Sequence, residues 1–233
     1  MLGRRGGADR RVPTFAGFKP TQVPGCMLWL RADMGITLGT GVSAWADQSG
    51  NGNSPTQATG SSQPTLVQSA IGGQPALSFN GTSEYMITPS ALTAAPMTIF
   101  AVGQTATQSV EHAMMADISG TYNYIYSFNP NFIVANSGGS QFSKSPTDTT
   151  IPHVYGVTIN GAASGLYVDG VKTTGTLGAS AASRQLFGAY PGPTVYWDKY
   201  IAEVIFYTSV LSAANISQVG KYLASRYGIA GSW

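Results

Sequence analysis

The sequence has very little charge, a single cysteine and only two histidines. Charged residues make up 9% of the chain, against about 25% in an average soluble protein. The lone Cys26 excludes a disulfide within the chain, so folding needs no oxidising compartment. Because Cys26 lies in an apolar run, we expect a buried, inert thiol rather than a nucleophile. Two histidines are too few for a histidine-rich metal site.

Long apolar segments are also missing. No window approaches the roughly 20 apolar residues of a membrane-spanning helix. Arginines occur near the N-terminus, but no apolar run of about 7–15 residues follows them, so we expect no secretory signal peptide. A protein of this kind would be made in a host cytoplasm and would reach the outside by a route such as lysis.

Positive charge gathers in residues 1–25, which we take as an N-terminal arm. Residues 1–20 hold five basic residues and one acidic residue, whereas the remaining residues hold 7 basic and 9 acidic ones. Glycines and prolines in the arm exclude a core of its own. It is expected either to be a solvated tail or to dock against an acidic partner or a neighbouring subunit. We do not expect nucleic-acid binding, because no aromatic platform separates the basic residues: Arg4, Arg5, Arg10, Arg11 and Lys19.

Residues 26–233 are expected to form one domain dominated by β-strands. Short runs rich in β-branched and aromatic residues, bounded by turn residues, predict strands. Asp169 and Gly170 lie between two such runs and are typical of a two-residue hairpin whose central positions both need φ > 0. Strands without alternating helices predict an antiparallel sandwich. The expected strands lie at residues 28–30, 76–79, 97–102, 122–128, 132–134, 154–159, 166–168, 171–173 and 202–207.

One helix is expected near the C-terminus. Ser212 is a natural N-cap, and Gly228 is a natural stop at the other end. Gly220 in the middle costs about 1 kcal/mol relative to alanine, which indicates close packing against the sheet. Four apolar residues recur between the caps at helical spacing: Ile216, Val219, Leu223 and Tyr227.

Residues 45–53 form a polar turn with an apolar anchor, Trp45. From Asp47 onward the turn is similar to the first half of an EF-hand calcium loop, with Asp47 and Asn51 as weak candidate ligands. The twelfth position is alanine instead of glutamate, so a structural interpretation fits better. In that interpretation Trp45 lies in the core, Asp47 accepts backbone N–H bonds, and Gly50 and Gly52 adopt left-handed conformations. We therefore expect no metal and no cofactor.

Six segments in order resemble the concanavalin A-like lectin/glucanase superfamily, in its laminin-G-like branch. They lie at residues 26–33, 42–53, 74–81, 97–102, 166–170 and 201–207, and with the terminal helix the match spans roughly residues 26–229. The resemblance implies an all-β, antiparallel jelly-roll sandwich with one C-terminal α-helix. It implies no single function, because this fold occurs in lectins, glycosidases, adhesion modules and surface proteins of phages and bacteria.

The pattern of acidic residues argues against an enzyme. Glycoside hydrolysis normally needs two carboxyl groups facing the scissile bond, and glucanases of this superfamily carry acidic residues at alternate positions on one strand. Glu84, Glu111 and Glu203 have no acidic neighbour two residues away. A serine triad with His112 or His153 is formally possible, but the Gly-x-Ser-x-Gly nucleophile motif is absent. We expect a non-enzymatic protein.

Aromatic residues provide the candidate site for carbohydrate. The prolines and glycine of residues 190–198 require a loop, and loops commonly carry binding residues. The candidate contacts there are Tyr190, Tyr196, Trp197 and Asp198, although Trp197 has the alternative of covering a sheet edge. Residues 122–128 place four aromatics on one strand face, which we expect to line the sandwich interior because apolar bulk belongs inside.

The sequence favours a non-enzymatic structural protein at the surface of a phage-like virion, as capsid decoration or as a tail component. The arm would dock it to other virion proteins or to neighbouring subunits of a homo-oligomer. The lectin-like domain would then serve adhesion or stabilisation. The alternative function is a glycan-binding module that recognises cell-surface polysaccharide, and a polysaccharide hydrolase or lyase ranks third. No membrane contact is expected.

Overall fold

The computed structural model describes residues 17–92, 94–108, 110–119, 123–128, 132–145, 147–179, 181, 183–191 and 195–233. Four arginines of the predicted arm, Arg4, Arg5, Arg10 and Arg11, lie outside these residues. The strands are β1 (Cys26–Arg31), β2 (Ile36–Leu38), β3 (Val42–Trp45), β4 (Thr65–Ile71), β5 (Gln74–Ser78), β6 (Met86–Ile87), β7 (Met97–Gln104), β8 (His112–Asp117), β9 (Asn123–Phe128), β10 (Phe132–Ser137), β11 (Ser140–Lys144), β12 (His153–Ile159), β13 (Ser164–Val168), β14 (Val171–Gly175), β15 (Gln185–Phe187) and β16 (Tyr200–Tyr207). The helices are α1 (Ala213–Tyr227) and the short 3-10 turns η1 (Pro20–Gln22), η2 (Gly60–Ser62) and η3 (Gly161–Ala163).

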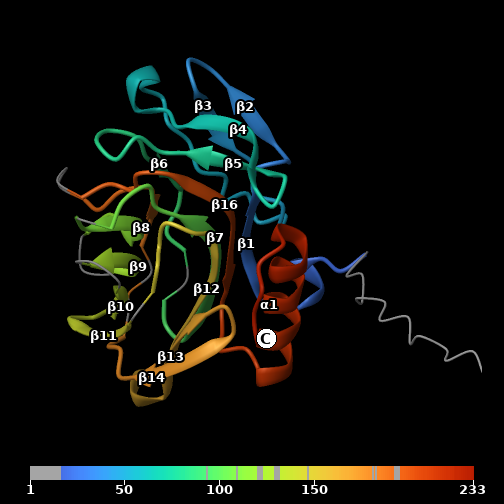
Figure 1. The fold of residues 1–233 in the computed structure, drawn as a ribbon, viewed down its shortest axis with the longest axis vertical. Helices are drawn as coiled ribbons and strands as arrows, with labels where there is room; N and C mark the ends of the chain where they lie inside the picture. Colours follow the sequence, from blue (N-terminus) through green and yellow to red (C-terminus); the bar gives the residue numbers. More distant parts are fainter. Residues whose placement is uncertain are drawn as a thin grey trace, which may run out of the picture.

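Two antiparallel sheets face each other, and α1 forms a third layer outside the larger sheet (Figure 1). The larger sheet has the order β14-β13-β12-β7-β16-β5-β4, with β1 also paired to β16. The smaller sheet has the order β11-β10-β9-β8-β15-β6, and β2 pairs with β3. The predicted all-β sandwich with a C-terminal helix is confirmed. None of the helices in the described part of the chain is long and apolar enough to span a membrane.

Strand β7 shows why a strand of the larger sheet is a nearly continuous apolar run in the sequence. Ile99 and Ala101 point into the core between the two sheets, whereas Phe100 and Val102 point into the layer beneath α1. Successive side chains of a strand face opposite sides, so a strand covered on both faces needs no polar positions. Every residue of β7 is accordingly buried.

Helix α1 begins and ends where the sequence predicts. The Ser212 side chain accepts a hydrogen bond from the Asn215 backbone N–H at 3.2 Å, and Gly228 closes the helix with φ of 64°. The predicted apolar positions of the helix face the larger sheet, where they contact Ile205 and Tyr207 among others. The predicted hairpin is also confirmed, because Asp169 and Gly170 have φ values of 50° and 85°.

Gly220 does allow a close approach, but the group that packs against it is the indole of Trp233 and not the sheet. A Cβ atom at this position would lie 2.0 Å from Cε3 of Trp233. The Trp233 ring in turn stacks on Tyr167 at a centroid distance of 6.2 Å and tilts against Phe100. The residues after α1 therefore return to the larger sheet and fill the space beside the helix.

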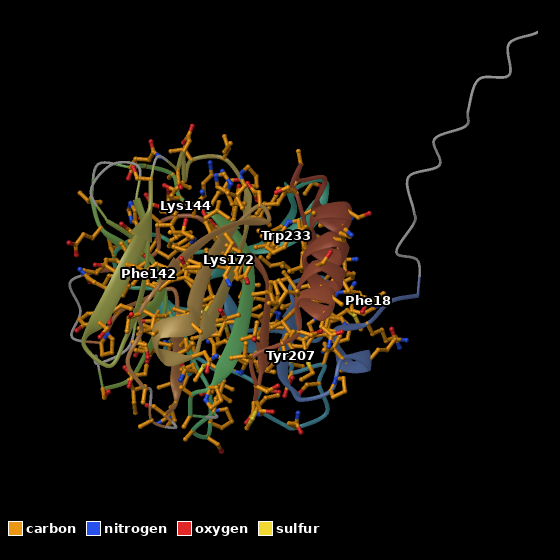
Figure 2. All side chains as sticks on the ribbon, turned by 90° about the horizontal axis from the view of Figure 1, so that it is seen from below. Phe18, Phe142, Lys144, Lys172, Tyr207 and Trp233 are labelled. Atoms are coloured by element: carbon orange, nitrogen blue, oxygen red, sulfur yellow. The ribbon has the colours of Figure 1, made fainter. Side chains whose placement is uncertain are left out.

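Packed structure starts before residue 26. Phe18 lies beside α1 (Figure 2), with its ring edge-on to Tyr222 at a centroid distance of 5.4 Å, and Val23 is 3% exposed. The Tyr207 hydroxyl donates a hydrogen bond to the carbonyl oxygen of Pro20 at 3.1 Å. Lys19 is exposed between these contacts. The part of the predicted arm from residue 17 to residue 25 thus belongs to the packed body.

Strand β9 orients differently from the sequence expectation. Ile125 is fully buried in the core between the sheets. Its neighbour Tyr126 is half-buried and opposes Val134 of β10 on the other face of the sheet. The expectation that the aromatic face of residues 122–128 lines the interior is therefore wrong for Tyr126. The alternation of side chains allows one face inside, and Ile125 occupies it.

Candidate functional site

A cavity of about 390 Å³ opens on the outer face of the smaller sheet, over β6 and β15. Ile87 and Leu186 are directly paired across these strands and form its floor. Their chain neighbours Met86 and Phe187 point the other way, into the core. Strand alternation thus places two aliphatic side chains at the bottom of an open site.

Three tyrosines line the cavity above this floor: Tyr85, Tyr190 and Tyr196. Tyr190 and Tyr196 come from one loop, whose ends are joined by a bridge between Ala189 and Tyr196. The Tyr190 N–H also donates to the carbonyl oxygen of Val195 at 2.9 Å. We call this cavity, lined by these tyrosines with Ile87, Ile118, Leu186, Ala189 and Pro191, the tyrosine pocket.

The tyrosine pocket includes two of the four residues that the sequence nominated for carbohydrate. Trp197 is instead fully buried in the core, and its Nε1–H donates to the carbonyl oxygen of Tyr200 at 3.0 Å. The prediction that Trp197 contacts a ligand is therefore wrong, because neither face of its ring reaches solvent. The Asp198 carboxylate accepts hydrogen bonds from the backbone N–H groups of Ala106 at 2.8 Å and Thr107 at 3.1 Å, so it tethers the loop.

His112 on β8 supports the same loop, a role the sequence did not reveal. Its imidazole is 3% exposed and lies edge-on to the Trp197 ring. Nδ1 is 3.1 Å from the carbonyl oxygen of Tyr196. A carbonyl oxygen can only accept, so Nδ1 carries the proton of this hydrogen bond. Nε2 lies 3.2 Å from Oγ1 of Thr107 and 3.4 Å from the Asp198 carboxylate.

The tyrosine pocket has an uncharged lining. The described side chains that line it are phenols and apolar groups. Arg184, which directly precedes the strand that carries Leu186, donates from Nε to the carbonyl oxygen of Thr88 at 2.8 Å. Such a lining can stack on flat apolar surfaces and hydrogen-bond to hydroxyl groups, but it offers no ionic partner.

The turn at residues 45–53 has the structural role that its sequence favours. Trp45 is fully buried, and Gly50 and Gly52 have φ values of 89° and 75°. Asn51 donates through its side-chain amide to the carbonyl oxygens of Cys26 and Met27 at 3.0 and 3.2 Å. The loop is thereby fastened to β1.

Asp47 is the centre of this turn. Oδ1 accepts from the backbone N–H groups of Trp29 at 3.0 Å and Ser49 at 2.9 Å, and Oδ2 accepts from the Asn53 N–H at 3.0 Å and the Ser49 hydroxyl at 2.8 Å. The prediction that Asp47 accepts backbone hydrogen bonds is confirmed. Within the described residues, no group of three or more His, Cys, Asp or Glu side chains is placed to hold a metal ion.

Two further titratable groups lie away from the tyrosine pocket, the half-buried Cys26 and the fully buried Glu203. Burial, with a smaller contribution from Asp47, raises the pKa of the Cys26 thiol to about 12, so the nucleophilic thiolate is scarce near neutral pH. Glu203 is 0% exposed and accepts hydrogen bonds from the Trp29 indole at 2.7 Å and from the hydroxyls of Tyr222 and Tyr227 at 2.9 and 3.0 Å. Burial raises its pKa as well.

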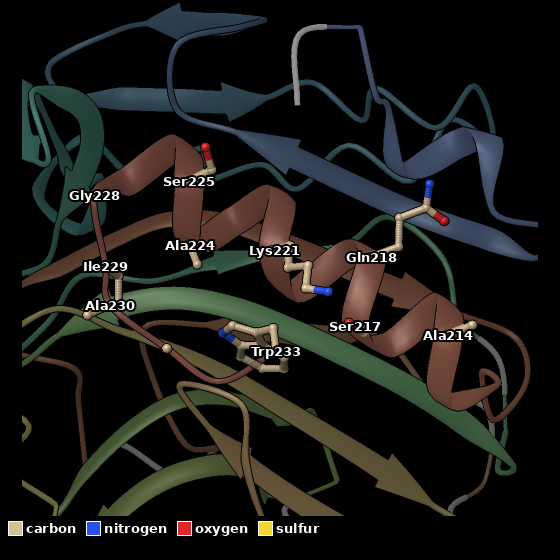
Figure 3. A pocket seen from close by; sticks show the side chains of 11 residues that line it. Ala214, Ser217, Gln218, Lys221, Ala224, Ser225, Gly228, Ile229, Ala230 and Trp233 are labelled. Atoms are coloured by element: carbon tan, nitrogen blue, oxygen red, sulfur yellow. The ribbon is translucent and has the colours of Figure 1, made fainter. Parts of the chain in front are cut away.

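A larger cavity, of about 850 Å³, lies between α1 and the residues that follow it (Figure 3). Most of its lining side chains are small, with Gln218 and Lys221 as the longer polar ones. Trp233 is the aromatic residue at this cavity, and its ring is already in contact with Gly220 and Tyr167. This cavity offers an aromatic ring already used for packing, whereas the tyrosine pocket offers three phenols.

Comparisons with known proteins support the fold. No protein-family model matches this sequence, and no curated protein sequence is significantly similar to it. Solved structures do match: the sialidase of Trypanosoma rangeli in complex with sialic acid has a TM-score of 0.65 at 14% identity, over 90% of this chain and 34% of that one. The binding domain of botulinum neurotoxin serotype D has a TM-score of 0.60 at 12% identity, over 87% of this chain and 52% of that one.

A second structure of the serotype D ligand-binding domain, in complex with N-acetylneuraminic acid, matches with a TM-score of 0.58 at 14% identity over 84% of this chain and 50% of that one. The chain therefore spans about a third of the sialidase and about half of the neurotoxin domain. At such identities the likeness concerns the fold. The chain has the concanavalin A-like β-sandwich fold that its sequence motifs resemble.

Proposed function

We propose that this protein is a glycan-binding module and that the tyrosine pocket is its binding site. The proposal rests on one observation: Tyr85, Tyr190 and Tyr196 converge over an aliphatic floor on the outer face of a sheet. Pyranose rings present an apolar C–H face and a rim of hydroxyl groups. Phenol rings stack on the first and exchange hydrogen bonds with the second, which makes tyrosine suited to both parts of a sugar.

The similar structures lend this proposal support by analogy. Two of them were solved with a bound sialic acid, namely the sialidase and the neurotoxin ligand-binding domain. One fold hosts many functions, so the likeness by itself assigns no ligand to this chain.

The proposed module has no catalytic role. Glu203 is enclosed by its hydrogen-bond donors, and the carboxylates of Asp47 and Asp198 each hold a loop through backbone N–H groups. A hydrolytic site needs two carboxyl groups that face the substrate. Prolonged incubation with capsular and storage polysaccharides should release no reducing ends, and a measurable release would contradict this part of the proposal.

A glycan array followed by affinity measurement tests the binding proposal. The protein should bind at least one glycan, and Tyr196→Ala should weaken that binding by at least about tenfold, since stacking on an aromatic ring is lost. Tyr196→Phe should retain most of the affinity. Lys221→Ala, in the cavity beside α1, is the matched control and should bind like the native protein. A blank array, or a loss caused by Lys221→Ala alone, would refute the assignment.

A component of a virion surface is the second candidate, and the charge asymmetry of the sequence favours it. Five basic residues against one acidic residue occur in residues 1–20, while the rest of the chain is slightly acidic. Removal of residues 1–16 spares the contacts of Phe18, Pro20 and Val23 with the body. The shortened protein should fold normally but lose incorporation into particles and association with neighbouring subunits. Unchanged incorporation would exclude a docking role for the arm.

A further inference from the structure

The lining of the tyrosine pocket contains features that select among sugars. We propose that it binds an uncharged 6-deoxyhexose, with the C5 methyl group of the sugar directed at the aliphatic floor and the ring stacked on a tyrosine. This inference depends on the proposed glycan binding and adds the chemical class of the sugar. It departs from the sialic acid seen in two of the similar structures.

The absence of charge from the lining argues against an acidic sugar. A carboxylate moved out of water needs a cation or several hydrogen-bond donors to offset the loss of its hydration. The described lining side chains of this pocket provide no cation, and their donors are three neutral phenol hydroxyls beside five apolar groups. Arg184 directly precedes β15 and is not among the described lining residues, and its Nε–H donates to the carbonyl oxygen of Thr88.

Three other cationic side chains of the described residues have partners outside the pocket lining. Arg31 and Arg226 share the carboxylate of Asp33, each at 2.6 Å. Lys172 lies over the ring of Tyr167. No lysine or arginine is among the described residues that line the tyrosine pocket, so the lining itself offers no cation to a sialic or uronic acid.

The floor distinguishes a methyl group from an N-acetyl group. Ile87 and Leu186, with Ile118 and Ala189 beside them, form an apolar surface without hydrogen-bonding side chains. A methyl group gains free energy on burial there and leaves nothing unsatisfied. An acetamido group would bring an amide N–H and a carbonyl oxygen, and a buried amide without partners is costly. A phenol hydroxyl can both donate to and accept from the ring hydroxyls of a sugar.

The size of the pocket agrees with a single sugar residue at its floor. Its volume of about 390 Å³ is at the lower end of the range for small-molecule sites. Tyr126 lies on the same outer face of the sheet. Burial and then the charge of Glu111 raise the pKa of its hydroxyl, and Tyr190 makes a smaller contribution in the same direction. In a bound oligosaccharide, the next sugar residue would extend from the pocket toward Tyr126, over the centre of the sheet.

The experiment compares methyl glycosides that differ only at carbon 6, by calorimetry or ligand-observed NMR with the full chain. One series is galactose, its 6-deoxy form and galacturonic acid, and the other is mannose, its 6-deoxy form and mannuronic acid, each in both enantiomers where obtainable. N-acetylgalactosamine and N-acetylneuraminic acid complete the panel. In the series that binds, the 6-deoxy sugar should be about fourfold tighter than the parent hexose, and the acidic sugar should be at least about tenfold weaker.

Variants link this preference to the pocket. Ile87→Thr keeps a branched side chain but adds a hydroxyl to the floor, so the preference for the 6-deoxy sugar should shrink while the parent hexose still binds. Arg184→Gln, with its melting temperature checked, should leave the affinity for the uncharged sugar unchanged.

The outcomes separate the two proposals. If acidic or N-acetylated sugars bind more tightly than the 6-deoxy sugar, or if Arg184→Gln abolishes the binding, the sugar class is wrong although glycan binding stands. If no sugar in the panel and no glycan on the array binds, the function itself is wrong. Tighter binding of the 6-deoxy sugar that is lost on Tyr196→Ala supports both.

Discussion

The Nδ1 atom of His112 lies 3.1 Å from the carbonyl oxygen of Tyr196, so a buried histidine of β8 fixes the backbone of the loop that forms the tyrosine pocket. The opposite side of the imidazole faces Thr107 and Asp198. His112 is not among the residues that line the pocket. It is a positioning residue, which determines where the Tyr196 ring is held.

His112→Ala should weaken glycan binding without removing any contact with the sugar. The carbonyl oxygen of Tyr196 would lose its donor, at a cost of about 1–3 kcal/mol in the free energy of unfolding. His112→Asn supplies an amide N–H near the place of Nδ1–H and should recover part of both losses. Urea unfolding and calorimetry on the three proteins measure the effects. Equal affinities for the alanine and asparagine variants would argue against a positioning role.

Asp47→Ala should destabilise the fold, because it removes a carboxylate that accepts four hydrogen bonds in one turn. Hydrogen bonds to charged groups contribute about 1.5–3 kcal/mol each in isolation, and we expect a total loss of at least about 2 kcal/mol, because solvent replaces part of them. Asn51→Ala in the same loop is the comparison variant and should cost less, because the hydrogen bonds of its exposed amide involve no charged group. Calcium or a chelator should leave the melting temperature unchanged. A calcium-dependent rise that Asp47→Ala removes would restore the metal interpretation of the loop.

Local signals in the sequence predicted local structure well. The cap at Ser212, the stop at Gly228, and the hairpin at Asp169 and Gly170 are satisfied by groups a few residues away, so they are visible without a fold. Strand β8, by contrast, was not predicted. Its alanines and its polar ends carry no strong strand preference, and its burial comes from neighbours in the sheet.

The candidate site was predictable only in part for the same reason. Tyr190 and Tyr196 were found because aromatic residues beside prolines in a loop favour recognition. Tyr85 was missed, since it reaches the pocket only through the pairing of β6 with β15, which are far apart in the chain. Trp197 was misplaced because a loop has no periodicity that tells which aromatic ring points inward. Long-range pairing, which a single sequence does not display, decided these cases.

Gly220→Ala tests the contact between α1 and the C-terminal indole. Helix propensity alone would make alanine about 1 kcal/mol more stable than glycine. The new Cβ would lie 2.0 Å from Cε3 of Trp233, so the ring would have to move, and overpacking of this kind costs about 1–3 kcal/mol. We therefore expect a net loss of stability in urea unfolding.

A double-mutant cycle with Trp233→Ala separates the two effects of Gly220→Ala. Without the indole, alanine at position 220 should become stabilising, because only the propensity remains. The same sign of Gly220→Ala in both backgrounds would mean that Trp233 is not the cause.

Asp169→Asn should reveal a pH-dependent contribution of His153. Burial lowers the pKa of His153, but the hydrogen bond and the charge of Asp169, with the carbonyl oxygen of Asp148, outweigh it and raise the pKa above the usual 6.5. A raised histidine pKa means that the stabilisation is complete below pH 6.5 and is lost as the pH rises through the folded-state pKa. Asparagine tolerates the φ of 50° at this position, so the hairpin survives.

The advantage of the native protein over Asp169→Asn should therefore be larger at mildly acidic than at alkaline pH. Urea unfolding at several pH values measures it. A difference that stays constant, or that grows toward alkaline pH, would show that His153 and Asp169 are not coupled in this way.

Glu203→Gln should change the pH dependence of stability in a defined direction. Burial raises the pKa of Glu203 above 4.5, against hydrogen bonds from Trp29 and Tyr222 that lower it. The folded state thus favours the neutral carboxyl, and its stabilising effect is complete below pH 4.5 and is lost as the pH rises through the folded-state pKa. Glutamine has a similar volume and does not ionise. Any steric or hydrogen-bonding cost of the substitution is the same at every pH.

The informative quantity is therefore the change with pH of the difference in free energy of unfolding between the two proteins. The native protein should lose stability relative to Glu203→Gln as the pH is raised from about 4 to about 8, by about 1.4 kcal/mol for each unit by which the pKa is raised. Arg226, whose Nε lies 3.6 Å from Oε2 of Glu203, is too distant for a hydrogen bond that would cancel the cost of burying the charge. A difference that is flat across this range would mean that Glu203 ionises as easily in the folded protein as in the unfolded chain.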